Sequence, residues 1–520
     1  MSYDRLSPLD ASFLHIEDDV SHMHIGAVCV FEGPPPTYDE MLATVAGKLH
    51  LVPRFRQVVQ TVPGELGRPV WVDYPHFNLE YHIRQSALPS PGGEEALWRL
   101  VGRVMSQQLD RSKPLWEHWI VEGLEGDRWA LISKTHHCMV DGVSGADMLA
   151  VVLDITPDAP TAPPREWVPQ PQPSAFQLAA DAVVSTVSSP FEQLRVLRSL
   201  TRVPRRAAAD AGQVLRSLWA AAGAVGRSAP QTSLNGPLGP HRRWMTVDSS
   251  VADVKAVRQA LGGTFNDVVL AAITRGFRDL LLSRGESVDR SIRTMVPVSV
   301  RARNDQGTAV GDGNYDNRVS AVFAELPIDL DDPIQCLASI SLQMEGLKES
   351  KHAMAGERLT ELTGFAPPML LAAAGRIGTR LPQRTVNTLT TNVPGPQLPL
   401  YARGRKMVVA YPYAPLGAQL RISVAIFSYD GKVTFGISAD FDSNPDLAVL
   451  AKGVESGMEE LVAVARRAQV RSSRRTGRAP ATRTLRAMTT PTANTIHPVV
   501  RGSQKKLKTI AITDTAMAKP

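Results

Sequence analysis

Two histidines, an aspartate and a glycine stand close together in the segment from His136 to Gly142. The apolar run from Trp129 to Ile132 leads into this segment and predicts a buried strand that ends at the histidines. A helix is predicted after the turn from the spacing of Met148, Leu149, Val151, Val152 and Ile155. The histidines are therefore expected at a strand end, where a scaffold can direct a side chain into a cleft.

The alternation of a strand separates the two histidines. Successive side chains point to opposite faces, so His136 and His137 are not expected to face the same substrate. One of the two histidines is then the candidate catalytic residue, and the other is a structural partner. A neutral imidazole can take a proton from a hydroxyl and return it to a leaving group. Asp141 is placed to orient an imidazole or to pair with a distant arginine, and Gly142 leaves room where the backbone bends or a ligand passes.

Three other interpretations compete with proton transfer at this segment. A lone buried histidine is more often a core residue than a catalyst, but the combination of residue types at a strand end favours a functional role. A metal site would use the two histidines and Asp141, yet neighbouring strand side chains diverge and no nearby H-x-x-x-H or cysteine pair completes the ligand shell. Cys138 is a candidate nucleophile beside a histidine base, but its apolar surroundings favour a small buried residue.

The segment from His136 to Gly142 matches the HHxxxDG signature of the chloramphenicol acetyltransferase-like acyltransferases, which include peptide-synthetase condensation domains. An ordered set of other segments resembles the bacterial wax ester synthase/diacylglycerol acyltransferase family, in particular its actinobacterial triacylglycerol synthases, over residues 1 to 465. These segments are Pro8-Leu9-Asp10, Met23-His24-Ile25-Gly26, Pro114-Leu115-Trp116, Asn235-Gly236-Pro237, His241-Arg242-Arg243, Asn266-Asp267 and Asn392-Val393-Pro394-Gly395-Pro396.

The resemblance implies acyl transfer from acyl-CoA to an alcohol, either diacylglycerol to give triacylglycerol or a fatty alcohol to give a wax ester. It implies that His137 is the general base, that His136 supports it, that Asp141 orients the site and that Gly142 leaves room for the acyl donor. No acyl-enzyme is required, in agreement with the absence of a G-x-S-x-G nucleophile elbow. No metal and no cofactor are implied, because acyl-CoA is a co-substrate.

Two alternative functions remain open from the sequence. A condensation-type transferase would take its acyl group from a carrier protein, which the full set of segments disfavours. A lipid-binding paralogue with little activity would keep the fold, which the intact His137 and Asp141 disfavour.

Three further residues are assigned to substrate binding. Asn266 and Asp267 precede an apolar helix, so they either cap that helix or, as the resemblance suggests, support the active site. Arg301 is predicted to contact the phosphates of CoA, although surface arginines are common.

Two other segments are given structural roles. Residues 392–396 are predicted to form a rigid turn, and Trp116 is predicted to bury its ring and brace the strand that carries His137.

The length of 520 residues favours two domains. The predicted fold is mixed α/β (α+β), and the resemblance implies two chloramphenicol acetyltransferase-like domains with the active site in a tunnel between them. The predicted division is an N-terminal domain at residues 1–157, a proline-rich and amphipathic helical linker at 158–232, a C-terminal domain at 233–465 and a tail at 466–520.

Local patterns predict the main elements of both domains. Strands are predicted at residues 27–31, 129–136, 243–247 and 292–300, and helices at 38–50, 94–109 and 251–261. The segments 420–427 and 433–439 flank Tyr429-Asp430-Gly431, which predicts a hairpin with an Asp-Gly turn. An amphipathic helix in the linker carries Phe176, Ala180, Val183, Val184, Val187, Phe191 and Leu194; it is either a crossover helix or an interfacial membrane anchor.

The charge of the chain is concentrated at its end. Residues 471–520 hold eleven Lys plus Arg and one acid, Asp514, so this segment carries +10 and the remainder −4 of the net +6. The basicity therefore does not indicate a nucleic-acid-binding core. The tail is predicted to be disordered, and it is either a solvated segment without a partner or a contact for anionic lipid headgroups, each basic side chain contributing about 1 kcal/mol near the surface.

The cysteines and the N-terminus indicate the compartment. Cys29, Cys138 and Cys336 are scattered and odd in number, which favours a reducing compartment without disulfides. The first residues lack the apolar core of a signal peptide, and no run of eighteen apolar residues is present. The protein is therefore expected in the cytoplasm, peripherally associated with the inner membrane face or a lipid droplet, and not secreted.

Overall fold

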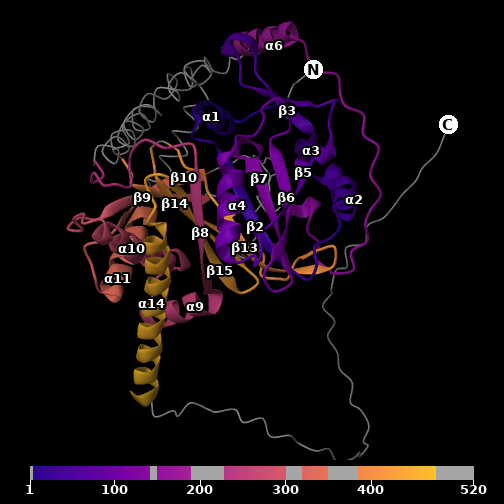
Figure 1. Ribbon diagram of the computed structural model, residues 1–520. Helices are drawn as coiled ribbons and strands as arrows, with labels where there is room; N and C mark the ends of the chain where they lie inside the picture. The colour runs from indigo at the N-terminus through magenta and orange to yellow at the C-terminus, as the bar shows by residue number, and fades with distance from the viewer. Residues whose placement is uncertain are drawn as a thin grey trace, which may run out of the picture. The chain divides into compact units, whose positions relative to one another are not determined.

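The computed structural model describes residues 4–140, 149–188, 228–299, 319–349, 385–417 and 419–475. The chain divides into two compact units, Met1–Val470 and Arg471–Pro520, and the fold below is that of the first unit. Its described strands form two six-stranded sheets and one three-stranded sheet, with helices packed against them (Figure 1).

The first large sheet carries the two histidines. Its strand order is β12-β13-β2-β7-β6-β5, and β7 runs antiparallel to both neighbours. Trp129 and Leu131 of β7 pack into the core on one face, and Ala130 and Ile132 pack into the core on the other, so the apolar run reflects burial on both sides. The strands are β2 (His24–Glu32), β5 (Ile83–Ala87), β6 (Trp116–Leu124), β7 (Arg128–His136), β12 (Tyr401–Ala402) and β13 (Arg405–Tyr413).

The second large sheet is built from the later part of the chain, in the order β10-β9-β11-β14-β15-β8. Strands β14 and β15 form the predicted hairpin, and the positive φ angles of Asp430 (43°) and Gly431 (81°) are those of a type I′ turn. The strands are β8 (Arg242–Ser250), β9 (Ile292–Ser299), β10 (Val319–Leu326), β11 (Thr388–Pro394), β14 (Ile422–Tyr429) and β15 (Lys432–Asp440).

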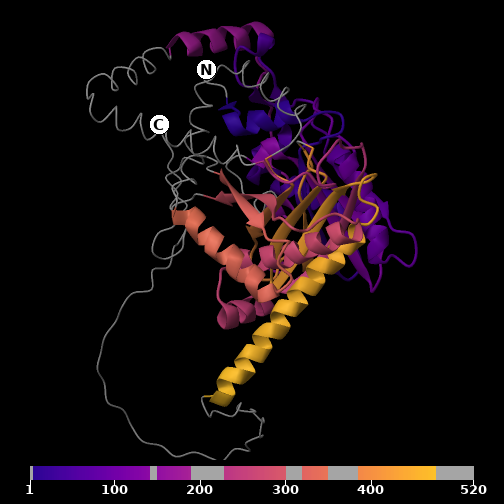
Figure 2. The same cartoon turned by 90° about the vertical axis from the view of Figure 1, so that its left-hand side faces the viewer.

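Four helices follow the strands of the second sheet and share its apolar core. They are α9 (Val251–Leu261), α10 (Phe265–Ser283), α11 (Pro333–Glu349) and α14 (Leu447–Arg475). The long helix α14 (Figure 2) packs closely on α10, because a Cβ on Gly453 would lie only 2.7 Å from the Cα of Gly276. Helix α14 continues to Arg475, so the prediction that the tail begins at residue 466 is wrong. The arginine-rich sequence there extends the helix.

The remaining elements surround the first sheet. A three-stranded sheet has the order β1-β4-β3, with β1 (Asp4–Arg5), β3 (Gln57–Gln60) and β4 (Val70–Asp73). The helices are α1 (Pro8–Ile16), α2 (Tyr38–Lys48), α3 (Leu79–His82), α4 (Glu94–Ser106) and α6 (Ala175–Ser188). Short 3-10 helices are η1 (Leu49–Leu51), η2 (Pro53–Arg56), η3 (Pro63–Glu65), η4 (His137–Val140) and η5 (Leu149–Val151).

Two strands of the first sheet, β12 and β13, come from the second half of the chain. Strand β13 pairs antiparallel with β2, although residues 405–413 fall within the predicted C-terminal domain. Val409, Tyr411 and Tyr413 of β13 share a core with Val28 and Val30 of β2 and with helix α4. This pairing removes an exposed edge from the first sheet and ties the two halves of the chain together.

Two predicted elements differ from the structure. A helix is predicted after the histidines, but residues 149–155 contain only the short 3-10 helix η5. Asp154 then pairs with Tyr401, and Ile155 is 73% exposed. The rigid turn predicted at residues 392–396 begins as strand, because Asn392 to Pro394 pair in parallel with β14. Pro394 is tolerated at this strand end because the pairing of β11 with β9 stops at Leu389.

The linker helix α6 packs through a face that periodicity did not select. Leu178 and Ala182 are buried against the three-stranded sheet, whereas Phe176 is 82% exposed and Ala180 is also exposed. Leu178 and Ala182 fix this part of the helix, and Phe176 faces solvent. The other members of the predicted face are not described: the side chains of Val183, Val184 and Val187, and the whole of Phe191 and Leu194.

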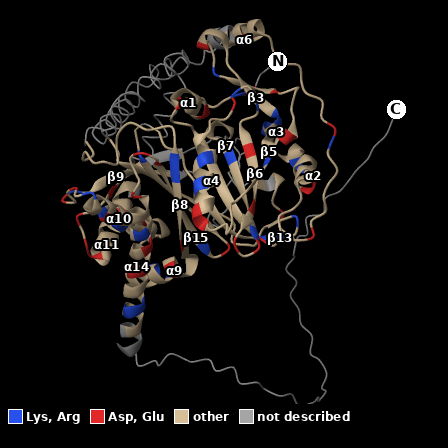
Figure 3. Ribbon diagram, viewed as in Figure 1, with Lys and Arg blue, Asp and Glu red and all other residues tan. Residues whose placement is uncertain are grey.

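Acidic and basic side chains are interspersed over the helices and loops that the structure describes (Figure 3). Within the same residues, no helix combines the length and apolar character that a membrane span requires. The described ranges also contain no group of three or more His, Cys, Asp or Glu side chains that could hold a metal ion.

Candidate active site

The two histidines lie where β7 ends and η4 begins, and their rings have different neighbours. His136 is buried and its ring is 6.2 Å from that of His24, which β2 places directly opposite. His137 stacks on Phe13 of α1, with ring centroids 3.9 Å apart and an interplanar angle of 24°. The two rings therefore have separate environments, as expected, but the cause is the change from β7 to η4 between His136 and His137 and not strand alternation.

His137 is held as a neutral imidazole. Burial lowers its pKa to about 4, against a smaller opposing effect from its own main chain. The residue is nevertheless partly accessible, and its main-chain N–H donates to the carbonyl of Met23 at 2.8 Å. A partly accessible, unprotonated imidazole on a fixed backbone has the form that a general base requires.

Of the two ring nitrogens of His136, only Nδ1 has a hydrogen-bond partner among the described residues. Its Nδ1 accepts a hydrogen bond from the main-chain N–H of Cys138 at 3.1 Å, so the proton of the neutral ring resides on Nε2. Nε2 lies 3.4 Å from Oε2 of Glu17. His136 therefore braces the main chain around its neighbour, and its supporting role in catalysis stays a prediction.

Glu17 belongs to the site and was missed in the sequence analysis. Its side chain is only 1% exposed and lies next to His136 and Arg111. Burial raises the pKa of Glu17, but the neighbouring His136 and the hydrogen bond and charge of Arg111 outweigh it and lower the pKa to about 2. A signal was available: a glutamate at the C-terminal end of a helix is unfavourable for the helix dipole, which indicates a compensating partner.

Cys138 does not have the properties of a nucleophile. Its side chain is buried, and burial, with smaller contributions from Asp10 and Glu17, holds the pKa of the thiol well above its usual range. The thiolate needed for nucleophilic attack is therefore disfavoured. Cys138 packs in the core of the first sheet, as its apolar sequence context indicates.

Trp116 braces the strand that carries the histidines, as predicted. It is fully buried between Phe55 (ring centroids 4.2 Å apart) and His82 (4.5 Å), and its Nε1 donates to the carbonyl of Phe55 at 2.9 Å. Trp116 lies opposite Thr135 of β7, and the preceding residue, Leu115, accepts a hydrogen bond from the main-chain N–H of His136 at 2.9 Å. The Pro-Leu-Trp segment thus fixes the strand end.

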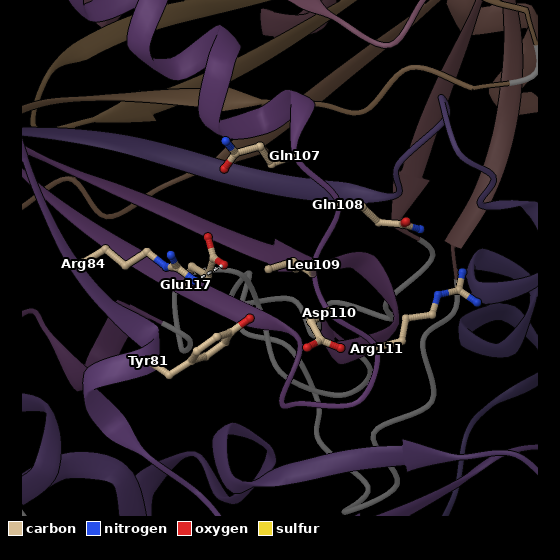
Figure 4. Close-up of a pocket in the computed structure, with 8 residues that line it drawn as sticks. All are labelled: Tyr81, Arg84, Gln107, Gln108, Leu109, Asp110, Arg111 and Glu117. Atoms are coloured by element: carbon tan, nitrogen blue, oxygen red, sulfur yellow. Dashed lines mark ion pairs between the residues drawn. The ribbon is translucent and has the colours of Figure 1, made fainter.

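An open, polar pocket of about 590 Å³ adjoins this network (Figure 4). Arg84 and Glu117 form an ion pair at 3.1 Å on one side of it, and Arg111 lies on the other side. The lining is Tyr81, Arg84, Gln107, Gln108, Leu109, Asp110, Arg111 and Glu117. These polar and charged walls do not suit a long acyl chain, which requires apolar surroundings.

Two motifs far apart in the chain meet in the second half. The side-chain amide of Asn392, at the end of β11, donates to Oδ1 of Asn266 in the first turn of α10. Both residues are partly accessible. Asp267 has a different place: Thr264 is the N-cap of α10, and Oδ2 of Asp267 accepts from the N–H of Thr264 at 2.8 Å and from the hydroxyl of Ser341 at 3.0 Å.

The capping interpretation of Asp267 is thus confirmed, whereas a direct contact with substrate stays a prediction for Asn266 and Asp267. Three other assigned residues, Asp141, Gly142 and Arg301, lie outside the described residues.

Replacement of Asp267 by alanine is expected to act on stability. It removes the reciprocal half of the capping box and leaves the hydroxyl of Ser341 without its acceptor, so the free energy of unfolding should fall by about 1–2 kcal/mol. Chemical denaturation measures this change, and the KM values for both substrates should stay within about threefold, a difference of well under 1 kcal/mol. A tenfold rise in either KM at unchanged stability would instead support substrate binding.

The chain was compared with known proteins. A family model described as the wax ester synthase/diacylglycerol acyltransferase catalytic domain matches residues 6–269, and a model of the C-terminal domain of that family matches residues 315–462. The chain is 38% identical over 469 residues to a Mycobacterium tuberculosis protein named probable diacylglycerol O-acyltransferase tgs1; the match covers 89% of this chain and 97% of the relative.

Solved structures share the fold. The wax ester synthase/diacylglycerol acyltransferase from Marinobacter aquaeolei VT8 matches with a TM-score of 0.60 and 27% identity, over 89% of this chain and all of that one. The first condensation domain of the calcium-dependent antibiotic synthetase matches with a TM-score of 0.52 and 14% identity, over 89% and 97% of the two chains. These matches confirm the predicted mixed α/β, two-domain architecture.

Proposed function

The chain belongs to the wax ester synthase/diacylglycerol acyltransferase family and is an acyltransferase, and we propose that it esterifies diacylglycerol with the acyl group of acyl-CoA to give triacylglycerol. The observation that carries the proposal is the neutral, partly accessible His137 at the end of β7, within a motif that the family matches enclose. Esterification of a long-chain alcohol to a wax ester is the same chemistry on a smaller acceptor.

In the proposed reaction His137 acts as the general base. It takes the proton from the acceptor hydroxyl while that oxygen attacks the thioester carbonyl and forms a tetrahedral oxyanion. When the intermediate collapses, the C–S bond breaks and the imidazolium returns the proton to the departing CoA thiolate. The surroundings that lower the pKa of His137 also make its imidazolium a strong acid, which favours this second transfer.

The other motif residues have supporting roles in this proposal. Asp141 orients the motif, Gly142 leaves space for the acyl donor, and Arg301 binds the CoA phosphates. The buried, protonated thiol of Cys138 supports direct transfer without an acyl-enzyme. No cofactor or metal takes part in these steps.

The acceptor is a neutral lipid, so the proposal places the enzyme peripherally at the inner membrane face or a lipid droplet. The exposed ring of Phe176 on α6, whose opposite face is fixed to the three-stranded sheet, supports such a contact. The basic segment 471–520 supplies the charge that anionic headgroups attract.

The proposal is tested by product analysis. Purified protein supplied with labelled palmitoyl-CoA and diolein is expected to form labelled triacylglycerol, and with hexadecanol a labelled wax ester. Palmitoyl-pantetheine in place of palmitoyl-CoA distinguishes a CoA-dependent enzyme from a carrier-dependent one, because a carrier-dependent transferase would use both donors equally well. Absence of any ester above a His137→Ala control would refute acyl transfer, and equal rates with both donors would refute the requirement for CoA.

A further inference from the structure

We propose that Glu17 is a positioning residue that fixes the main chain on both sides of His137. The proposal rests on the acyl-transfer function proposed above. Glu17 follows the last residue of α1, and its N–H bonds to the carbonyl of Phe13, the residue that stacks on the ring of His137. Its carboxylate turns inward to the end of β7, where it is almost completely buried.

One connection runs through His136. Oε2 of Glu17 faces Nε2 of His136 at 3.4 Å, and Nδ1 of the same ring accepts from the N–H of Cys138 at 3.1 Å. Nε2 makes no hydrogen bond at this distance, but the negative charge of Glu17 favours the tautomer with the proton on Nε2 and leaves Nδ1 free to accept. The ring is thereby a rigid spacer between Glu17 and the residue directly after His137.

A second connection runs through Met23, which precedes β2. The N–H of Met23 donates to Oε1 of Glu17 at 3.2 Å, and the carbonyl of Met23 accepts from the N–H of His137 at 2.8 Å. The carboxylate of Glu17 therefore positions both the carbonyl of Met23, which accepts from the N–H of His137, and the N–H of Cys138. The two connections leave the backbone of His137 little freedom to rotate.

Glu17 is itself fixed in place. Nε of Arg111 donates to Oε2 of Glu17 at 2.9 Å, and Nη2 of Arg111 donates to the carbonyl of Leu14 in α1, also at 2.9 Å. Nε2 of His24 lies 3.7 Å from Oε1 of Glu17. This nitrogen accepts a hydrogen bond from the main-chain N–H of Leu109, so it carries no proton and His24 is not a second cation beside Glu17. A buried carboxylate satisfied by an arginine and several hydrogen bonds is a stable anchor, whereas an unpaired one is costly.

Glu17→Gln tests the first connection. The amide oxygen can still accept from Met23, but its NH2 group meets the Nε2–H of His136, so donor faces donor. His136 must then move or change tautomer, which removes the acceptor for Cys138. We expect kcat to fall about 10–100-fold with both KM values within threefold, since small displacements of a catalytic group cost up to about 10²-fold. Glu17→Asp keeps the charge but withdraws it by one methylene, and it should also lower kcat.

Glu117→Gln is the matched control. Glu117 is a buried carboxylate on the neighbouring strand β6 and pairs with Arg84, as Glu17 pairs with Arg111. Loss of its charge should lower the melting temperature comparably while kcat stays within twofold. Wild-type kcat in Glu17→Gln or in Glu17→Asp, or an equal loss of kcat in Glu117→Gln, would overturn the proposal.

A double-mutant cycle locates the effect. In a His136→Asn background the amide oxygen replaces Nδ1 and nothing replaces Nε2, so adding Glu17→Gln should lower kcat by less than threefold. Full additivity would overturn the His136 connection.

The rate at which diethyl pyrocarbonate modifies His137, measured by peptide mass spectrometry, should rise in Glu17→Gln but not in Glu117→Gln. This last readout needs no turnover, so it tests the positioning of His137 even if the proposed acyl transfer fails.

Discussion

Replacement of His137 by alanine is expected to lower kcat for triacylglycerol formation by about 10²–10⁴-fold, the usual contribution of a general base. Without the imidazole, the acceptor hydroxyl must attack the thioester while it still carries its proton, and the CoA thiolate must leave without a proton donor. The KM values should change little, because the ring stacks on Phe13 and its role is proton transfer, not substrate affinity.

The measurement is steady-state ester formation with purified wild-type and variant protein at matched folded fractions. His118→Leu provides the control, because His118 is also a buried histidine of the first sheet, but its ring packs against Phe55 and Trp116. Its kcat should remain within twofold of wild type. Ester formation by His137→Ala within tenfold of wild type would show that another group removes the proton.

Acid is expected to destabilise the fold steeply, because several histidines are buried in their neutral form. Burial lowers the pKa of His82 to about 4, of His118 to about 3 and of His137 to about 4, from 6.5. Between pH 6.5 and 4 the unfolded chain therefore binds protons that the folded chain does not, so stability falls as pH falls. Three such groups correspond to about 4 kcal/mol per pH unit near pH 5.

Glu17 adds to the same trend at lower pH. Its pKa is about 2 in the fold against 4.5, so the stability it contributes is fully present above pH 4.5 and is lost as pH falls towards 2. Urea denaturation at pH 7 and at pH 5 measures the contribution of the three histidines, and a further measurement below pH 4 adds that of Glu17. A free energy of unfolding that is equal at the two pH values would contradict the assignment of these histidines as buried and neutral.

His118→Leu isolates one of these groups. Among the described residues, neither ring nitrogen of His118 has a hydrogen-bond partner, so an apolar side chain of similar volume removes a desolvation cost without breaking a hydrogen bond. The variant should be at least as stable as wild type at pH 7, and the loss of stability between pH 6 and pH 5 should shrink by about 1 kcal/mol. An unchanged pH dependence would show that His118 is not the buried neutral group inferred here.

The sequence by itself determined the features that depend on residues close together in the chain. The apolar run before His136, the Asp-Gly turn of the β14–β15 hairpin and the helical spacing of α9 each follow from local periodicity and turn chemistry, and the structure confirms all three. The ordered motifs indicated the family, which the comparisons confirm.

Only the tertiary structure decided the features that depend on distant segments. The pairing of β13 with β2, the contact of Asn392 with Asn266 and the buried cluster of Glu17, His136 and Arg111 join residues that no local pattern connects. The physical reason is that periodicity reports which face of an element is buried, while packing decides what it is buried against. A glutamate at a helix end looks solvated in the sequence, and it becomes part of the site because α1 lies over the end of β7.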